Sequence, residues 1–235
     1  MIRRIAILPR DAFHLGLMLA LTFSTGVIDA VGYLGLDRVF SGNMTGNVVV
    51  LGMALAGGDN LPVLGPALAL VGFMAGAAIG GRVLKGSDGG WDRRSTVMFG
   101  GVALVMLVLS VVLFVAGDDF SRTLRVCIST TLAIAMGAQA AAARVVAVKD
   151  IPTVVVTSTI TGLAADSVLG SGKGGGSGRR ASAVVLILAG AAAGAGLLQW
   201  HLGASLVLSA AITGVVAVLG AIHSTHHSAA ASVSP

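Results

Sequence analysis

The sequence predicts an all-α, polytopic helical membrane protein that forms one integral domain over residues 1–235. Hydrophobic residues make up 55% of the chain and charged residues only 11%, and the mean hydropathy is +0.94. A soluble domain carries roughly a quarter of its residues as charges. The apolar residues also gather in runs, several of which reach the roughly 20 residues that a helix needs to cross a bilayer. Composition and run length therefore both indicate a membrane protein.

Eight apolar segments follow one another along the chain, and two of them are short. In order, they cover residues 12–36, 43–57, 62–84, 96–116, 122–148, 153–169, 181–199 and 203–222. The segments at 43–57 and 153–169 fall short of a spanning helix, which is typical of re-entrant segments. The sequence therefore predicts six spanning helices plus two short re-entrant segments.

The distribution of Lys and Arg between the loops distinguishes this topology from one with eight spans. If all eight segments crossed the membrane, 8 basic residues would lie inside and 7 outside. If the two short segments return to the side from which they enter, 12 lie inside and only Arg38, Arg122 and Arg125 lie outside. Because cytoplasmic loops collect Lys and Arg, the six-span topology is favoured, with both termini in the cytoplasm.

A duplicated polar motif divides the chain into two halves. Residues 39–47 (VFSGNMTGN) align without a gap with residues 155–163 (VVTSTITGL), at an offset of 116 residues. We therefore expect a first repeat over residues 12–117 and a second over residues 122–222. Each repeat would contribute three spans, an odd number, so the two repeats would have inverted topology, as in many transporters.

Small residues are expected to bring the two halves together. The stretch AGAAIG at residues 75–80 aligns with AGAAAG at residues 189–194, at an offset of 114 residues. The glycines with small-xxx-small spacing are Gly72, Gly76 and Gly80 in the first half and Gly190 and Gly194 in the second. This spacing lets membrane helices approach closely, so we expect these glycines at the central crossing of the halves. Tight packing without any symmetry axis is the alternative.

The polar side chains of the duplicated motif are candidates for a substrate path. Polar or irregular backbone at membrane depth is tolerated only where protein buries it or where it lines a water-filled cavity. The candidates are Asn43, Thr45, Asn47, Thr157, Thr159 and Thr161. Asn and Thr can hydrogen-bond a passing solute, but they also commonly cap helices, and the two roles are compatible.

Asp29 is the residue least expected inside a span. A carboxylate at the centre of a membrane helix costs about 2.5–3.5 kcal/mol on insertion scales, so Asp29 should face the interior of the bundle. It could bind a cation, carry a proton or orient a substrate amine; it could equally pair with Arg144 or cap a re-entrant helix. Gln139 has a roughly equivalent place in the second half and joins the candidate substrate path.

Four stretches of the chain resemble the YoaK family of bacterial transmembrane proteins. They are residues 26–34 (GVIDAVGYL), 43–47 (NMTGN), 136–139 (MGAQ) and 157–162 (TSTITG), and the resemblance extends over nearly the whole chain. It implies a polytopic inner-membrane protein of unassigned activity. Ala140 departs from the family pattern, because similar proteins often have Asn after this glutamine.

Several classes of function find no support in the sequence. The chain has no Glu, the H-E-x-x-H spacing is absent, and the single cysteine, Cys127, has no His in its region, so neither catalysis nor a metal site is expected. No cofactor is expected either. The basic residues flank loops instead of forming a stripe with aromatic residues, which argues against a nucleic-acid partner. Residues 223–235, rich in Ser, Ala and His, are expected to form a disordered cytoplasmic tail.

The function that these features favour is a small-solute transporter or channel, with a midplane site formed by the two polar re-entrant motifs. The expected partners are the lipid bilayer and an unknown small solute or ion. The alternative is a non-transporting membrane scaffold or accessory subunit whose polar motifs serve internal packing. Because six short spans enclose little volume, a homodimer is one way to complete a transport unit.

Overall fold

The computed structural model describes residues 9–58, 60–87, 89–117, 119–146, 156–172 and 176–231, and side chains as far as Thr225. In these ranges every regular element is a helix, and no strand occurs. Six helices are long and apolar enough to cross a membrane, and two more are apolar but shorter. The predicted class, an all-α polytopic membrane protein, is therefore confirmed.

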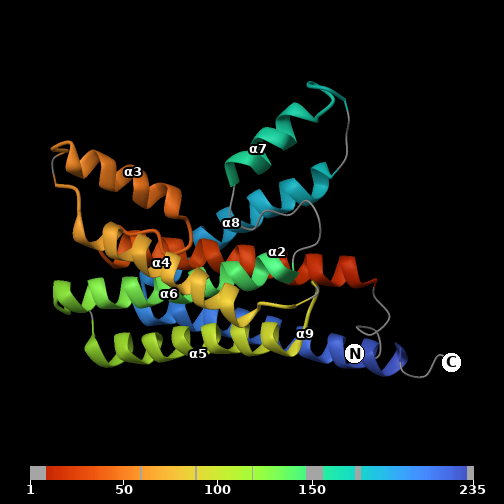
Figure 1. The fold of residues 1–235 in the computed structure, drawn as a ribbon. Coiled ribbons are helices and arrows are strands. Elements are labelled where there is room, and N and C mark those ends of the chain that lie inside the picture. Colours follow the sequence, from red (N-terminus) through yellow and green to blue (C-terminus); the bar gives the residue numbers. More distant parts are fainter. Residues whose placement is uncertain are drawn as a thin grey trace.

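The six long helices form one bundle, and the two short helices lie beside it (Figure 1). The long helices are α2 (Arg10–Ala30), α4 (Leu64–Val83), α5 (Arg93–Ala116), α6 (Arg122–Val146), α8 (Ser177–Leu198) and α9 (Leu202–Ala231). The short helices, α3 (Met44–Leu55) and α7 (Val156–Ala165), lie on the same side of the bundle and diverge from each other (Figure 1). Helix α2 begins and α9 ends at the same end of the bundle, as an even number of spans requires.

Local sequence explains where some of these helices begin and end. Asp92 is the N-cap of α5, and its carboxylate accepts a hydrogen bond of 2.7 Å from the backbone amide of Ser95. Gly117 follows α5 with a φ of 71°, a left-handed conformation that glycine adopts without strain. Helix α2 passes into one π-helical turn, η1 (Val31–Gly35), and π-helical turns are frequent at functional sites. The irregular turn leads the chain out of the first span towards α3.

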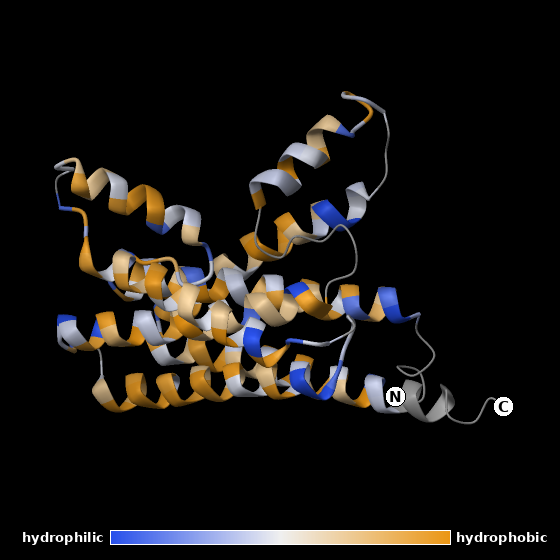
Figure 2. Cartoon of the chain, viewed as in Figure 1, coloured by the Kyte–Doolittle hydropathy of each residue, from blue (hydrophilic) through white to orange (hydrophobic). Residues whose placement is uncertain are grey.

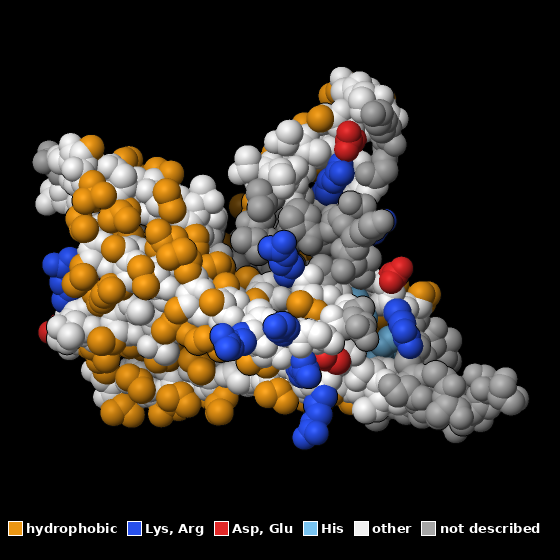
Figure 3. All heavy atoms as spheres, viewed as in Figure 1, with side chains coloured by type: hydrophobic (Ala, Val, Ile, Leu, Met, Phe, Trp, Pro, Cys, Tyr) orange, Lys and Arg blue, Asp and Glu red, His pale blue; other side chains and the backbone are white. Residues whose placement is uncertain are grey.

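Three pairs of long helices hold the bundle together. Helix α4 packs along α6, α2 packs along α8, and α5 packs along α9. Ile28, Met106, Leu132 and Leu206 are completely buried in the shared apolar core. Apolar side chains cover much of the outer faces of α3, α4 and α5 (Figure 3), as expected for surfaces in contact with lipid chains.

The small residues of the central spans lie where the two halves of the chain cross. Gly72 would place a Cβ 3.0 Å from the carbonyl oxygen of Thr130, so α4 and α6 touch through their backbones. Gly194 would place a Cβ 2.8 Å from the carbonyl oxygen of Val27, so α8 and α2 do the same. Gly76, Gly80 and Gly190 complete these two contacts. Each contact joins one helix of the first half to one of the second.

Helix register relates the two contacts to each other. Gly26 of α2 would place a Cβ 2.9 Å from the amide nitrogen of Ala191 on α8. Gly137 of α6 would place a Cβ 2.9 Å from the amide nitrogen of Ala77 on α4. Gly26 and Gly137 therefore have matching positions in the α2–α8 and α6–α4 pairs.

The end of the chain differs from the expected tail. Helix α9 does not stop at residue 222 but continues to Ala231, and His223 is only 2% exposed. Its imidazole ring stacks on Phe13 of α2 with 4.2 Å between ring centroids, and this buried contact extends the helix beyond the apolar run. The remainder of the tail, residues 232–235, lies outside the described residues.

Hydrophilic residues gather at helix ends and connections of the bundle (Figure 2).

Candidate functional site

Asp29 binds the loop that precedes α3. Its side chain is 9% exposed, and one carboxylate oxygen accepts a hydrogen bond of 2.7 Å from the backbone amide of Gly42. The backbone amides of Ser41 and Asn43 also interact with the carboxylate. Consecutive amides at the start of a helix form a concavity that favours an anion. Of the roles left open by the sequence, the one nearest to the structure is capping of the short helix, because the side chain of Asp29 holds the backbone amides that lead into α3.

Asn47 fixes the same loop from the other side. Its side-chain oxygen accepts a hydrogen bond of 2.8 Å from the amide of Phe40, and its side-chain nitrogen donates one of 2.6 Å to the carbonyl of Phe40. The residue is completely buried. Asn47 therefore ties α3 to the loop that precedes it. We call this pair of hydrogen bonds to Phe40 the clamp. Asn43 is half-buried and Thr45 is exposed, so these neighbours stay closer to the surface.

A small cavity lies behind this loop, between α2 and α6. Its lining residues are Leu21, Thr25, Gly42, Met136, Gln139, Ala140 and Ala143, and its volume is about 20 Å³. That is enough for about one water molecule. Gly42 forms part of the wall: an added Cβ there would lie 2.7 Å from the side-chain methyl of Thr25 and 3.4 Å from the carboxylate of Asp29. The cavity therefore exists because residue 42 has no side chain.

Gln139 gives this cavity its polar character. The side chain is 3% exposed, and its oxygen, Oε1, has no hydrogen-bond partner among the described residues. The other polar side chain in the lining is Thr25, whose hydroxyl donates to the carbonyl of Leu21 at 2.9 Å and so keeps its oxygen as an acceptor. A species that donates hydrogen bonds, or a small cation, fits these two acceptors.

The candidates on α7 lie apart from this cavity. Thr157 and Thr161 are exposed on α7, and Thr159 is buried. Arg180 of α8 holds the end of α7, because it donates to the carbonyl of Gly162 at 2.9 Å and pairs with Asp166 at 2.5 Å. Figure 1 shows α7 leaving the bundle on the α8 side while α3 leaves on the α4 side. The structure thus brings Asp29, the first motif and Gln139 together, and leaves the second motif separate.

The comparisons with known proteins cover the same region. A model of the family described as "Protein of unknown function (DUF1275)" matches residues 17–219. The chain belongs to the DUF1275 family. It is also similar to the "UPF0700 transmembrane protein YoaK" of Bacillus subtilis (strain 168), with 30% identity over 156 residues, which are 66% of this chain and 68% of the relative. No solved structure matches the chain.

The resemblance to the YoaK family is therefore confirmed, and the DUF1275 match contains the complete candidate site. Residues 17–219 include Asp29, Asn47 and Gln139, together with both short helices. The name of the relative and the six long apolar helices support a multi-pass transmembrane protein. They assign no activity, so the chemistry of the cavity has to be argued from its own residues.

Six of the seven residues that line the cavity were not among the predicted site residues, and two of these, Thr25 and Gly42, bear on its chemistry and shape. Thr25 lies one helical turn before Asp29, and a hydroxyl at that place in an apolar run gave no signal of its own. Gly42 lies within the quoted polar motif, but its contact with Asp29 spans 13 residues and depends on how the chain turns after η1. Pairing Asp29 with Arg144 does not occur among the described ion pairs.

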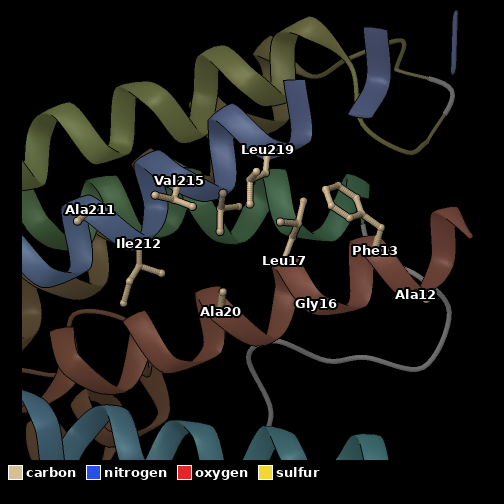
Figure 4. Close-up of a pocket in the computed structure, with 10 residues that line it drawn as sticks. Ala12, Phe13, Gly16, Leu17, Ala20, Ala211, Ile212, Val215 and Leu219 are labelled. Carbon is tan, nitrogen blue, oxygen red and sulfur yellow. The ribbon is translucent and has the colours of Figure 1, made fainter. Parts of the chain in front are cut away.

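A second hollow in this DUF1275 chain is a poor site for a polar solute. An apolar groove of about 530 Å³ lies between α2 and α9, with the side chains of Phe13, Leu17, Ile212 and Val215 along it (Figure 4). Its other lining residues are small or apolar as well. Such a surface offers no group to orient a polar molecule.

Proposed function

We propose that the chain moves a small solute across the membrane and that its path passes through the α2–α6 cavity. The observation that carries this proposal is the buried Oε1 of Gln139, which faces a cavity and has no protein partner among the described residues. Leaving a buried acceptor unpaired costs about 1–3 kcal/mol. A helix interface that served packing alone would have an apolar residue here. A transient ligand that donates to Gln139 accounts for the amide.

The size and chemistry of the cavity indicate the kind of solute. A volume of about 20 Å³ holds one species of the size of water or a small monovalent ion. The acceptors are the oxygens of Gln139 and Thr25, and the carboxylate of Asp29 lies just beyond Gly42. This arrangement favours a hydrogen-bond donor or a cation over an anion. A larger solute would need the α2–α6 interface to open.

The packing of the two halves supports a mechanism of alternating access. Helices α2 and α8 cross as α6 and α4 do, and Gly26 and Gly137 have matching places in the two pairs. Inverted repeats of this kind hold substrate near the midplane and expose it to each side in turn. We place the end of the bundle at which α2 begins on the cytoplasmic side of the inner membrane, because most Lys and Arg lie at that end. A homodimer remains part of the proposal.

The alternative function is a scaffold or accessory subunit that transports nothing. The observation in its favour is that the polar side-chain atoms of Asp29 and Asn47 hydrogen-bond to the protein's own backbone, at Gly42 and Phe40. Under this proposal the cavity holds a fixed water molecule that hydrogen-bonds to Gln139.

Flux measurements in proteoliposomes separate the two proposals. Vesicles that contain purified protein would be tested for uptake of Na⁺, K⁺, ammonium and water. We expect one of these fluxes to exceed that of empty vesicles and to fall at least tenfold in Gln139→Leu. Gln199→Leu is the matched control, because Gln199 is exposed at the end of α8. Equal fluxes in wild type, Gln139→Leu and empty vesicles would favour the scaffold.

A further inference from the structure

A second polar cavity lies at the end of the bundle where α2 begins. Its volume is about 210 Å³, room for about seven water molecules, and it is bounded by the first turns of α2, the connection before α5 and the late turns of α9. Arg10 and His14 come from α2, and His223 and Ser224 come from α9. It is distinct from the α2–α6 cavity and shares no lining residue with it.

The two histidines are built into the wall of this cavity. His14 is 7% exposed and His223 is 2% exposed, and their ring centroids are 6.0 Å apart. Phe13 stacks on His223, and Trp91 lies 6.4 Å from His14 between ring centroids. These aromatic contacts fix both imidazole rings. The two imidazoles are therefore positioned by the fold and not carried on flexible surface chains.

The charge of the wall selects an anion. Arg10 supplies a positively charged guanidinium group, which matches the geometry of phosphate oxygens. The imidazoles add further groups that can donate hydrogen bonds, whereas the hydroxyl of Ser224 donates to the carbonyl of Ala221 at 2.9 Å. No Asp or Glu is among the described residues that line the cavity. Gly89 and Gly90 close the cavity with φ values of 84° and 83°, which leaves their side of the wall free of side chains.

We infer that this cavity binds a phosphate group, held by Arg10 and the imidazoles of His14 and His223. It lies at the end of the spans, where phospholipid headgroups lie against a membrane protein. The phosphate could belong to an anionic lipid headgroup or to a soluble phosphate compound, since the recognising groups are the same. This inference does not depend on the proposed transport function.

Calorimetric titration of the full chain in an uncharged detergent tests the site and separates the two sources. One arm uses inorganic phosphate and the other uses a short-chain phosphatidylglycerol. We expect saturable binding in at least one arm, with about one equivalent per chain. Binding in the first arm assigns a soluble phosphate, and binding only in the second assigns a lipid.

Variants decide whether any binding occurs in this cavity. Arg10→Gln should weaken binding roughly tenfold or more, because charge-assisted hydrogen bonds are the strong ones. Arg10 is exposed, so its replacement leaves the core intact; His14→Gln, which keeps a donor, should give a smaller loss. Arg93→Gln is the matched control, since Arg93 is exposed at the same end but does not line the cavity. An equal loss in Arg10→Gln and Arg93→Gln, or no binding in either arm, would overturn the inference.

Discussion

The carboxylate of Asp29 and the backbone amide of Gly42 are joined by a hydrogen bond of 2.7 Å that ties the first span to the loop before α3. The backbone amides on both sides of Gly42 also interact with the carboxylate. Asp29 therefore fixes the position of the loop from which α3 begins. The charge of Asp29 is thus compensated by the amino end of α3. A buried carboxylate in a span is usually functional, and here its first task is to shape the wall of the cavity.

Replacing Asp29 separates its structural task from a role in transport. Asp29→Ala removes the acceptor for Gly42 and should lower the free energy of unfolding by about 1.5–3 kcal/mol. Asp29→Asn retains an oxygen acceptor and should fold, while it loses the negative charge. If the charge couples an ion to transport, flux in proteoliposomes falls with Asp29→Asn although the unfolding midpoint changes little. Asp119→Asn, at an exposed position, serves as the control.

Asn47 offers a test of the clamp on Phe40. Asn47→Ala removes both hydrogen bonds, so we expect a loss of about 2–3 kcal/mol, at roughly 1 kcal/mol for each bond plus the cost of the unpaired backbone groups. Asn47→Asp keeps the acceptor for the amide of Phe40 and loses the donor to its carbonyl. Thermal unfolding in detergent should rank wild type above both variants, and Asn47→Asp should be no more stable than Asn47→Ala, because a buried carboxylate oxygen would face the carbonyl of Phe40. Equal midpoints for the three proteins would contradict the clamp.

The same substitution is expected to have opposite effects at a glycine of the central crossing and at a glycine outside it. An added Cβ at Gly76 would collide with the carbonyl of Ile134, so Gly76→Ala should destabilise the protein by about 1–3 kcal/mol. Gly16 of α2 has open space around the position of a Cβ. Gly16→Ala should leave stability unchanged or raise it by up to about 1 kcal/mol, because alanine favours the helix. Thermal unfolding of both variants measures the difference, and a loss at Gly16 equal to that at Gly76 would refute the packing argument.

The class of the fold could be predicted from the sequence because the features that determine it are local. The length of each apolar run sets the number of spans, and the short runs became α3 and α7. The site depends on relations that a single sequence does not contain. Ala140 follows Gly137 by as many residues as Asp29 follows Gly26, so Ala140, and not Gln139, has the place on α6 that Asp29 has on α2. A shift of one residue turns a helix by about 100°, and only the packed register reveals it.

The same relation explains why the two halves differ. Asp29 provides the first half with a carboxylate that binds the loop before its short helix, and Ala140 provides none for the second half. Helix α7 is instead held at its far end, by Arg180 from α8. The two short apolar runs form two short helices, but the anchoring of these helices differs: a carboxylate of the first span holds the loop before α3, and an arginine of α8 holds the end of α7.

The cap of α5 predicts a dependence on pH. Partial burial acts to raise the pKa of Asp92, but hydrogen bonds from Ser87 and Ser95 and the charge of Arg94 outweigh it, so the pKa lies below its usual value of 3.8. A carboxyl group with a lowered pKa contributes stability above the pKa of the unfolded chain and loses it as the pH falls through the folded value. Asp92→Asn should therefore cost stability at pH 7 and cost less below pH 3. Unfolding midpoints of wild type and Asp92→Asn across this range test it, and a constant difference would contradict the assignment.

The exposed threonines of α7 decide whether the second motif meets water. Single cysteines at Thr157, Thr159 and Thr161, on a Cys127→Ala background, would be treated in intact cells and inverted vesicles with a membrane-impermeant thiol reagent. Since Thr157 and Thr161 are exposed and Thr159 is buried, the outer two positions should react faster than the middle one if α7 borders an aqueous path. Leu107→Cys on the outer face of α5 gives the rate for a position in contact with lipid. Rates at 157 and 161 no faster than at 107 would place α7 against lipid and remove it from the substrate path. Faster labelling from one side only would identify the side from which the motif is reached.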